Sequence, residues 1–249
     1  MGFAIRREIP GPNRYLVDLS LDADAQMKSL DQKWRYNLRQ ALANSIDVRL
    51  CESEADRETF RVMYESMVER KNFSSPPDDS LLGARGADIA PHLRPRLVMG
   101  FHEGRPVIGA TVSTFGDTAY YAFGASKPAA LSLKAGYALQ WWIVRWLSEQ
   151  KQARWYDLGG EGTDQGLRQF KKGLTGKGGA TVVMNGEYDR WTHLPGRLAA
   201  DVIFGVRAAR QHISHWLSLV LLLSSAASEK QMPLLSLAEE RLPLLLSVI

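Results

Sequence analysis

The chain of 249 residues has one cysteine, Cys51, and five histidines. A single cysteine cannot form an internal disulfide, which favours a reducing compartment. The histidines and the cysteine are scattered rather than set at the spacings of metal ligands, so we expect no metal site. The sequence therefore excludes a disulfide-rich secreted domain and predicts a function that needs no metal.

Long apolar runs are also missing. No stretch reaches the ~18 to 20 apolar residues that a membrane-spanning helix needs. The longest run, WLSLVLLL at residues 216–223, is too short to cross, and the first fifteen residues lack the apolar core of a secretory signal. We expect a cytoplasmic protein. Its leucine-rich tail either packs back as a helix or makes a peripheral contact with the inner face of the membrane.

The overall composition is that of a globular protein. With 45% hydrophobic and 23% charged residues, the chain can bury a proper core. The net charge of +4 fits an anionic ligand such as a nucleotide, a coenzyme or an RNA end. It is too small to indicate a dedicated nucleic-acid-binding protein.

The apolar periodicity predicts a mixed α/β fold, with a central mixed sheet flanked by helices and an antiparallel meander within it. One domain is expected over residues 1–195, with 1–13 as a loose lead-in, and a C-terminal helical extension over 196–249. Residues 72–96, rich in Pro, Gly and Asp, predict an irregular segment over a site. Strands are expected at 14–21, 46–52, 95–103, 105–116, 118–126, 154–160 and 180–188, and helices at 22–43 (two in sequence), 53–71, 128–149, 164–173 and from 195 to about 225.

The chain is organised around residues 156–179, which read YDLGGEGTDQGLRQFKKGLTGKGG. Gly159 and Gly160 follow a strand and allow a turn that approaches a ligand closely. A helix that starts near Asp164 places Phe170 and Lys171 at its far end, one apolar and one cationic. Such a pair suits a site that stabilises an acyl carbonyl or a phosphate. An ordinary strand–loop–helix connection with a solvated lysine gives the same pattern.

Several segments in this order resemble the Fem family, the aminoacyltransferases of peptidoglycan interpeptide bridges within the GNAT acyltransferase superfamily. They are KWRYNLRQA, YYAFGAS, the helix with ALQWWIVRW, and YDLGG followed by FKKGL. The resemblance covers residues 14–188. Fem enzymes carry two GNAT-like domains, and this chain resembles the second domain with the lead-in that precedes it. The expected fold is therefore a GNAT-like sheet with flanking helices.

The resemblance implies that an acyl or aminoacyl group is transferred to an amine. The implied donor is aminoacyl-tRNA, no tightly bound cofactor is implied, and a peptidoglycan precursor is one candidate acceptor. Phe170 then packs the aminoacyl or sugar end of the donor, and Lys171 stabilises charge on the carbonyl or the leaving 3′ oxygen. A positioned cation of this kind contributes on the order of 3 kcal/mol. Asp157 is a candidate base for the amine proton, although a carboxylate beside two glycines is also typical of a turn.

Further donor contacts are expected from four residues. In the resembled family the segment that holds Arg35 and Arg39 lies beside the donor-binding domain, which implies a phosphate contact. Lys134 is a second candidate for a phosphate, and a surface lysine is the alternative. Tyr121 alternates with its neighbour across a strand, so one of the two tyrosines faces the site.

The type of donor and the presence of catalysis both stay open. In coenzyme-A-dependent GNAT enzymes, a Q/R-x-x-G-x-G/A segment opens the central helix and binds the pyrophosphate. Here residues 133–138 keep the Gly-x-Ala half, but a leucine replaces the first polar residue. An acyl-CoA-dependent N-acetyltransferase that acts on a small amine is therefore one alternative. A non-catalytic Fem-like domain that binds RNA or a cell-wall enzyme is the other.

Overall fold

The computed structural model describes residues 4–7, 13–71, 90, 93–160, 164–183, 187–189, 194–206 and 209. Their contacts divide the chain into two units, Arg7–Glu187 and a second made of Met1–Arg6 with Tyr188–Ile249. Strands β1 (Ala4–Arg7) and β9 (Glu187–Asp189) form a two-stranded sheet, and residues 194–206 are helical. The expected boundary at residue 195 falls inside the second unit.

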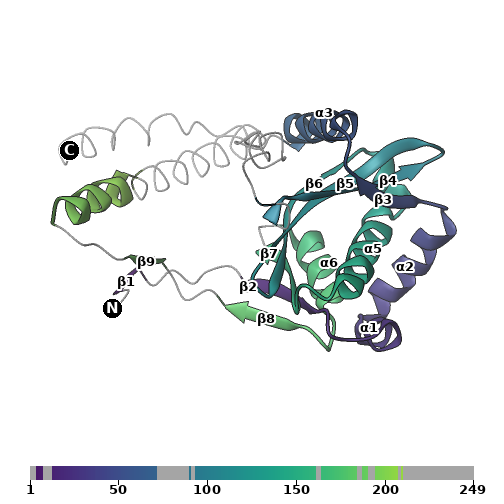
Figure 1. Ribbon diagram of the computed structural model, residues 1–249, viewed down its shortest axis with the longest axis horizontal. Helices are drawn as coiled ribbons and strands as arrows, with labels where there is room; N and C mark the ends of the chain where they lie inside the picture. The colour runs from purple at the N-terminus through teal and green to yellow at the C-terminus, as the bar shows by residue number, and fades with distance from the viewer. Residues whose placement is uncertain are drawn as a thin grey trace, which may run out of the picture. The chain divides into compact units, whose positions relative to one another are not determined.

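The larger unit is built on one seven-stranded mixed sheet (Figure 1). Its strands are β2 (Asn13–Asp18), β3 (Asp47–Cys51), β4 (Arg96–His102), β5 (Arg105–Phe115), β6 (Thr118–Ser126), β7 (Trp155–Gly160) and β8 (Ala180–Val183). They lie in the order β3-β4-β5-β6-β7-β2-β8. Among these strands, only β6 and β7 pair in parallel. The expected mixed sheet and its antiparallel meander, β4 to β6, are both confirmed.

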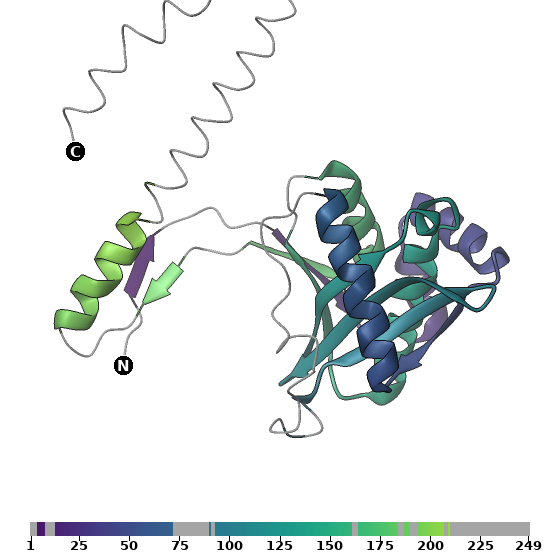
Figure 2. The ribbon, with the colours of Figure 1, turned by 90° about the horizontal axis from the view of Figure 1, so that it is seen from above.

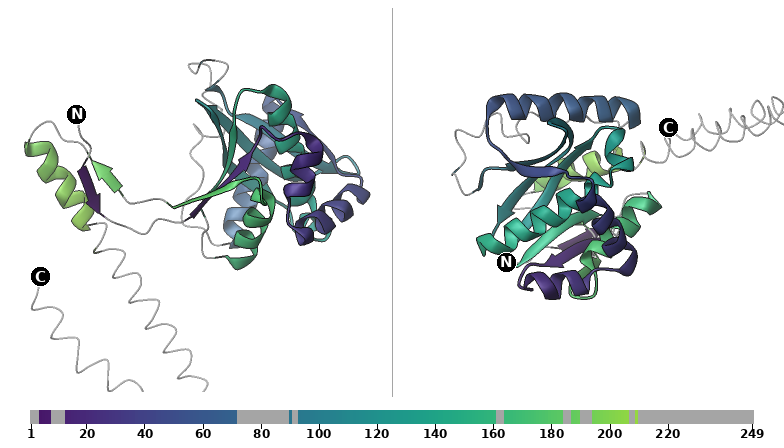
Figure 3. Two further views of the ribbon diagram at one scale, coloured as in Figure 1. Left: turned by 90° about the horizontal axis from the view of Figure 1, so that it is seen from below. Right: turned by 90° about the vertical axis from the view of Figure 1, so that its right-hand side faces the viewer.

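Helices cover the two faces of this sheet unequally (Figures 1 and 3). One face carries α3 (Glu54–Lys71), which Figure 2 shows lying along the sheet. On the other face lie α1 (Ala23–Ser29), α2 (Gln32–Ala43), α5 (Ala135–Gln150) and α6 (Gln165–Thr175). Strands β4 and β5 are therefore buried on both sides, as their runs of apolar residues require, whereas the edge strand β8 is mostly exposed.

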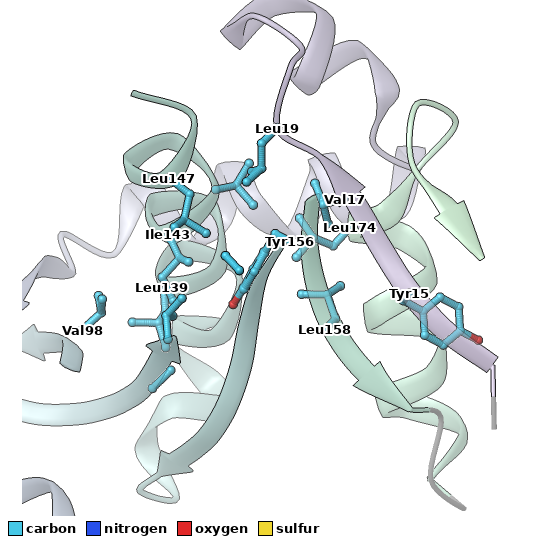
Figure 4. Packing of buried hydrophobic residues seen from close by; sticks show 14 of the residues in the cluster. Tyr15, Val17, Leu19, Val98, Leu139, Ile143, Leu147, Tyr156, Leu158 and Leu174 are labelled. Carbon is cyan, nitrogen blue, oxygen red and sulfur yellow. The ribbon is translucent and has the colours of Figure 1, made fainter. Parts of the chain in front are cut away.

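The main core lies between the sheet and the helices α2, α5 and α6. Tyr156 and Leu158 of β7 pack beside Ile143 of α5 and Leu174 of α6 (Figure 4). The Tyr156 hydroxyl is fully buried and donates to the Gln140 side chain at 2.9 Å, which satisfies it inside the core. A smaller cluster fills the opposite face, beneath α3: Cys51, Phe60, Met63, Leu97, Met99, Phe101 and Ala125.

The two helices expected after Asp22 are confirmed. Trp34 and Leu38 of the second helix are buried. Ser53 caps the start of α3, because its hydroxyl accepts from the Asp56 backbone N–H at 3.1 Å and donates to the Asp56 carboxylate at 2.6 Å.

The prediction of a single helix over residues 128–149 is wrong. The chain forms a short helix α4 (Ala129–Ser132) and then α5, and between them Lys134 takes a left-handed conformation with φ of 55°. The break moves Gly136 from the expected interior of a long helix into the first turn of α5. On α5, Trp141 is only half-buried, whereas Leu139 is buried.

Other expectations fall partly or wholly outside the described residues. This holds for nearly all of the irregular segment at 72–96 and for the helix expected beyond residue 210. The strand expected at 180–188 appears as two strands, β8 and β9, in different sheets. Strand β1 lies in the stretch for which a loose lead-in was expected. In the part of the chain that the structure describes, no helix is long and apolar enough to cross a bilayer.

Candidate active site

The parallel strands β6 and β7 pair over only three positions. Residues 118–120 pair with 155–157, and β6 then continues to Ser126 while β7 continues to Gly160 without further pairing between them. Backbone groups in this stretch of the two strands are therefore open to other partners. The helices α5 and α6 begin shortly after these two strand ends. The sheet thus opens at the point where the two helices start.

The end of β7 is fixed by a turn and an ion pair. Gly159 has φ of +79°, which favours glycine, and its N–H donates to Asp157 Oδ1 at 2.8 Å. The other carboxylate oxygen accepts from Arg14 on β2, with Nε and Nη2 each at 2.7 Å. Both Asp157 oxygens are thus engaged. The observed contacts of Asp157 are those of a carboxylate that stabilises a turn.

Lys171 reaches back from α6 to the same strand end. Its half-buried ammonium group donates to the Gly160 carbonyl at 2.7 Å. Desolvation by burial lowers the pKa of Lys171 below its usual 10.5, while Asp157 acts to raise it and Arg14 to lower it. The cation is therefore held at the end of β7 and is partly shielded from bulk solvent.

Phe170 points to the other side of α6. Its ring lies 4.9 Å from that of Tyr137 on α5 and 5.7 Å from that of Trp34 on α2, measured between centroids. The Tyr137 hydroxyl accepts from the Asn37 side-chain amide at 3.1 Å, which fixes this ring in turn. The aromatic contacts anchor α6 against α5 and α2, and so set where Lys171 lies.

A cleft of about 690 Å³ opens at the first turn of α5. Asp164, which also caps α6, is its only acidic lining residue among those described. No side chain of the described residues caps the first turn of α5. The backbone N–H groups at this helix start carry partial positive charge and therefore attract anions. The lining residues are Arg70, Lys71, Ile108, Ser126, Lys127, Pro128, Ala130, Leu131, Lys134, Gly136, Tyr137, Asp164, Gly166, Leu167 and Phe170.

Two further clefts adjoin this one. A cleft of about 450 Å³ shares Tyr137, Gly166 and Phe170 with it and adds Lys33 and Lys172. A groove of about 490 Å³ along α3 shares its Arg70 end. We call the 690 Å³ cleft the basic cleft, because Arg70, Lys71, Lys127 and Lys134 line it. It continues in two directions from the start of α5.

The structure brings together only part of the predicted site. Phe170 and Lys134 line the basic cleft, whereas Lys171, Asp157, Gly159 and Gly160 form the adjacent strand end.

Two predicted arginines lie elsewhere on α2. Arg35 donates to the Lys28 and Leu30 carbonyls at 3.1 and 2.5 Å, which closes the end of α1, and Arg39 is exposed. Neither lines the basic cleft. Their predicted phosphate contact stays a prediction.

Tyr121 is the first residue of β6 beyond the parallel pairing. Its hydroxyl lies over Gly124, where a Cβ atom would clash with it. Burial, with a smaller contribution from Tyr64, raises the pKa of Tyr121 to about 12. The side chain is therefore neutral at physiological pH and can act as a hydrogen-bond donor at the opening between the strands.

The sequence analysis missed four cations of this region. Arg70, Lys71 and Lys127 line the cleft from the end of α3 and the end of β6, and Arg14 pairs with Asp157. The positive φ of Lys134 carries no sequence signal, because lysine is not a residue that favours it. A search for cations just after each strand and helix would have found Lys127 and Lys71.

A family model of the GNAT acetyltransferase domain matches residues 28–172, which is more than half of the chain. The chain belongs to the GNAT acetyltransferase family. The expected class, an acyltransferase, is thereby confirmed at the level of the family. A search of curated protein sequences found no match.

Solved structures show the same fold at low sequence identity. The crystal structure of FemX has a TM-score of 0.59 at 15% identity over 76% of this chain, and the chain covers 65% of FemX. A conserved protein of unknown function from Bacteroides thetaiotaomicron has a TM-score of 0.50 at 12% identity over 70% of this chain and 58% of its own length. The fold expected from the Fem resemblance is confirmed.

Proposed function

We propose that this GNAT domain transfers an acyl or aminoacyl group from a phosphate-bearing donor to an amine. One observation carries the proposal: the Lys171 ammonium group lies at the end of β7, and its neighbour in the chain, Phe170, lines a basic cleft at the uncapped start of α5. A cation at the strand end and an anion site at the helix start are the two features that an activated acyl donor requires.

The basic cleft binds the anionic part of the donor in this proposal. Arg70, Lys71, Lys127 and Lys134 line the cleft at the first turn of α5, and the start of this helix, which no side chain of the described residues caps, adds backbone donors for phosphate oxygens. Phe170 forms part of the wall and packs the apolar or sugar portion of the donor. The reacting carbonyl then lies toward the strand end that Lys171 marks.

In the chemical step the amine nitrogen attacks the donor carbonyl carbon, and the new C–N bond forms as the bond to the leaving oxygen or sulfur breaks. Lys171 stabilises the negative charge that develops on the carbonyl oxygen, a contribution on the order of 3 kcal/mol. The proton that the amine loses ends on the leaving group, so the products are an amide and a 3′-hydroxyl or a thiol. The role of Asp157 as base stays a prediction, and its contacts favour holding the turn.

Two donors fit this site. The segments that resemble the Fem family imply aminoacyl-tRNA as the donor and an amine of a peptidoglycan precursor as the acceptor, and the fold shared with FemX is compatible with both. This version of the proposal places the protein in the cytoplasm, at the inner face of the membrane. Acyl-CoA is favoured by a different observation, because Gly136 and Ala138 lie in the first turn of α5 instead of deep in a helix. That position matches a pyrophosphate site on backbone amides.

Donor exchange separates these versions. The full chain is incubated with ¹⁴C-acetyl-CoA or with tRNA charged with ¹⁴C-amino acids, each with a panel of amine acceptors, and the labelled amide is counted. We expect transfer from one donor and its loss in Lys171→Met. A protein that binds either donor but transfers from neither would instead support the non-catalytic domain.

A further inference from the structure

Arg14 contacts the candidate active site from the strand next to β7. Its backbone pairs with Gly160 across β2 and β7, and its side chain crosses toward Asp157. Two guanidinium nitrogens each lie 2.7 Å from the same carboxylate oxygen. The side chain of Arg14 is 33% exposed, so one edge of the guanidinium faces solvent while the other is occupied.

The carboxylate it contacts is buried. The Asp157 side chain is 6% exposed, and its second oxygen accepts from the Gly159 N–H. A buried carboxylate that loses its cationic partner either finds another or destabilises the fold by several kcal/mol. Asp157 therefore needs a cation within reach at all times.

Lys171 is the other cation near this carboxylate. Its ammonium group is bound to the Gly160 carbonyl rather than to Asp157. The charged groups of the described residues that act on it are Asp157 of β7 and Arg14 of β2. The three charges sum to +1, so one cation is always left unneutralised, and that cation is Lys171 only while Arg14 holds the carboxylate.

We propose that Arg14 is a positioning residue that keeps Asp157 from neutralising Lys171, so that the ammonium group stays available for the reacting carbonyl. The inference rests on the role given to Lys171 in the proposed function. It assigns Asp157 and Arg14 to the placement of charge and not to proton transfer.

The two single substitutions are expected to shift the Lys171 pKa in opposite directions. In Arg14→Gln the free carboxylate turns to Lys171, which raises the Lys171 pKa and neutralises the cation. In Asp157→Asn the amide still accepts from Gly159 and Arg14 repels Lys171, so the Lys171 pKa falls. Because Asp157 acts on Lys171 more strongly than Arg14 does, the order expected is Arg14→Gln highest, then wild type, then the double variant, then Asp157→Asn lowest.

The Lys171 pKa is measured by NMR titration of the full chain after reductive ¹³C-methylation, with the Lys171 signal assigned by its absence in Lys171→Arg. Arg145→Gln is the matched control, because Arg145 is also ion-paired, to Glu149, and its side chain is similarly exposed at 36%. It should leave the Lys171 signal unchanged. If Arg14→Gln does not fold, the comparison of the double variant with Asp157→Asn still tests the order.

Activity gives the second readout, with whichever labelled donor the wild type uses. Arg14→Gln should lower kcat by about 10- to 100-fold, the effect of a misplaced catalytic group, with little change in donor KM. Arg14→Lys should recover part of the loss. Adding Asp157→Asn to Arg14→Gln should restore kcat at least about tenfold, because the competing carboxylate is gone.

An unchanged Lys171 pKa in Arg14→Gln, or a double variant as inactive as Arg14→Gln, overturns the positioning role. Failure of the proposed function looks different. In that case Lys171→Met transfers as well as the wild type, while the order of Lys171 pKa values is unaffected.

Discussion

Lys134 combines a strained backbone with a place in the basic cleft, and the substitution Lys134→Gly separates the two. Its φ of 55° at the start of α5 is the left-handed region, which costs a residue with a Cβ about 1–2 kcal/mol. Glycine removes that cost but gives the unfolded chain about 0.4–1 kcal/mol of extra entropy. The net gain in the free energy of unfolding is therefore about 0.5–1 kcal/mol.

The same substitution removes a charge from the proposed donor site. A hydrogen bond from a charged group contributes about 1.5–3 kcal/mol, and the half-buried position of Lys134 reduces that to about 1 kcal/mol. Donor Kd should rise about fivefold. The variant is thus expected to be more stable and to bind the donor more weakly.

Lys151 offers a matched control at the other end of the same helix. It is also a lysine in the left-handed region, with φ of 52°, and it lines a different cleft. Lys151→Gly should gain similar stability and leave donor binding within about twofold. Stability is measured by urea unfolding and affinity by calorimetric titration with acetyl-CoA and with aminoacyl-tRNA. Equal weakening of donor binding in both variants, or unchanged binding in Lys134→Gly, would refute the cleft as the donor site.

Three further outcomes are expected. Gly176 and Gly104 both have positive φ, but a Cβ at Gly176 would lie 2.3 Å from the Ser29 carbonyl oxygen, whereas a Cβ at Gly104 would have no atom within 4 Å. In urea unfolding, Gly176→Ala should therefore lower the free energy of unfolding by more than about 3 kcal/mol, and Gly104→Ala by about 1 kcal/mol. In a 295 nm absorbance titration, Tyr121→Phe should remove one tyrosine that ionises near pH 12; no loss of a late-titrating group would contradict its burial. The transfer rate should fall as pH rises through a Lys171 pKa below 10.5, because only the cation is active, and a flat profile to pH 10.5 would argue against that role.

Much of the fold could be predicted from apolar periodicity, since α2, α3 and the meander follow their buried faces directly. The break before α5 could not, because residues 128–149 have apolar side chains on nearly every side of a helix and Lys134 gives no local sign of a left-handed residue. The strand order was also beyond the sequence. It depends on β2 being inserted between β7 and β8, a pairing of segments more than 130 residues apart.

Only the part of the candidate site that lies within one local stretch of the chain could be predicted. Phe170, Lys171 and the glycine pair lie within one short stretch, so local pattern was enough to find them. Arg14 lies 143 positions before Asp157, and only the long-range pairing of β2 with β7 brings them together. The contacts of Arg35 with two carbonyls at the end of α1 could not be predicted either, because they depend on how α1 and α2 meet.

The central claim is that a cation at position 171 stabilises the carbonyl under attack by an amine. The most direct test is the rate of labelled amide formation by the wild type, Lys171→Arg and Lys171→Met with the donor that the wild type accepts. We predict a fall of about 100-fold or more in kcat for Lys171→Met, in line with ~3 kcal/mol, and partial activity for Lys171→Arg. A Lys171→Met protein that folds and transfers within about twofold of the wild-type rate would contradict the claim.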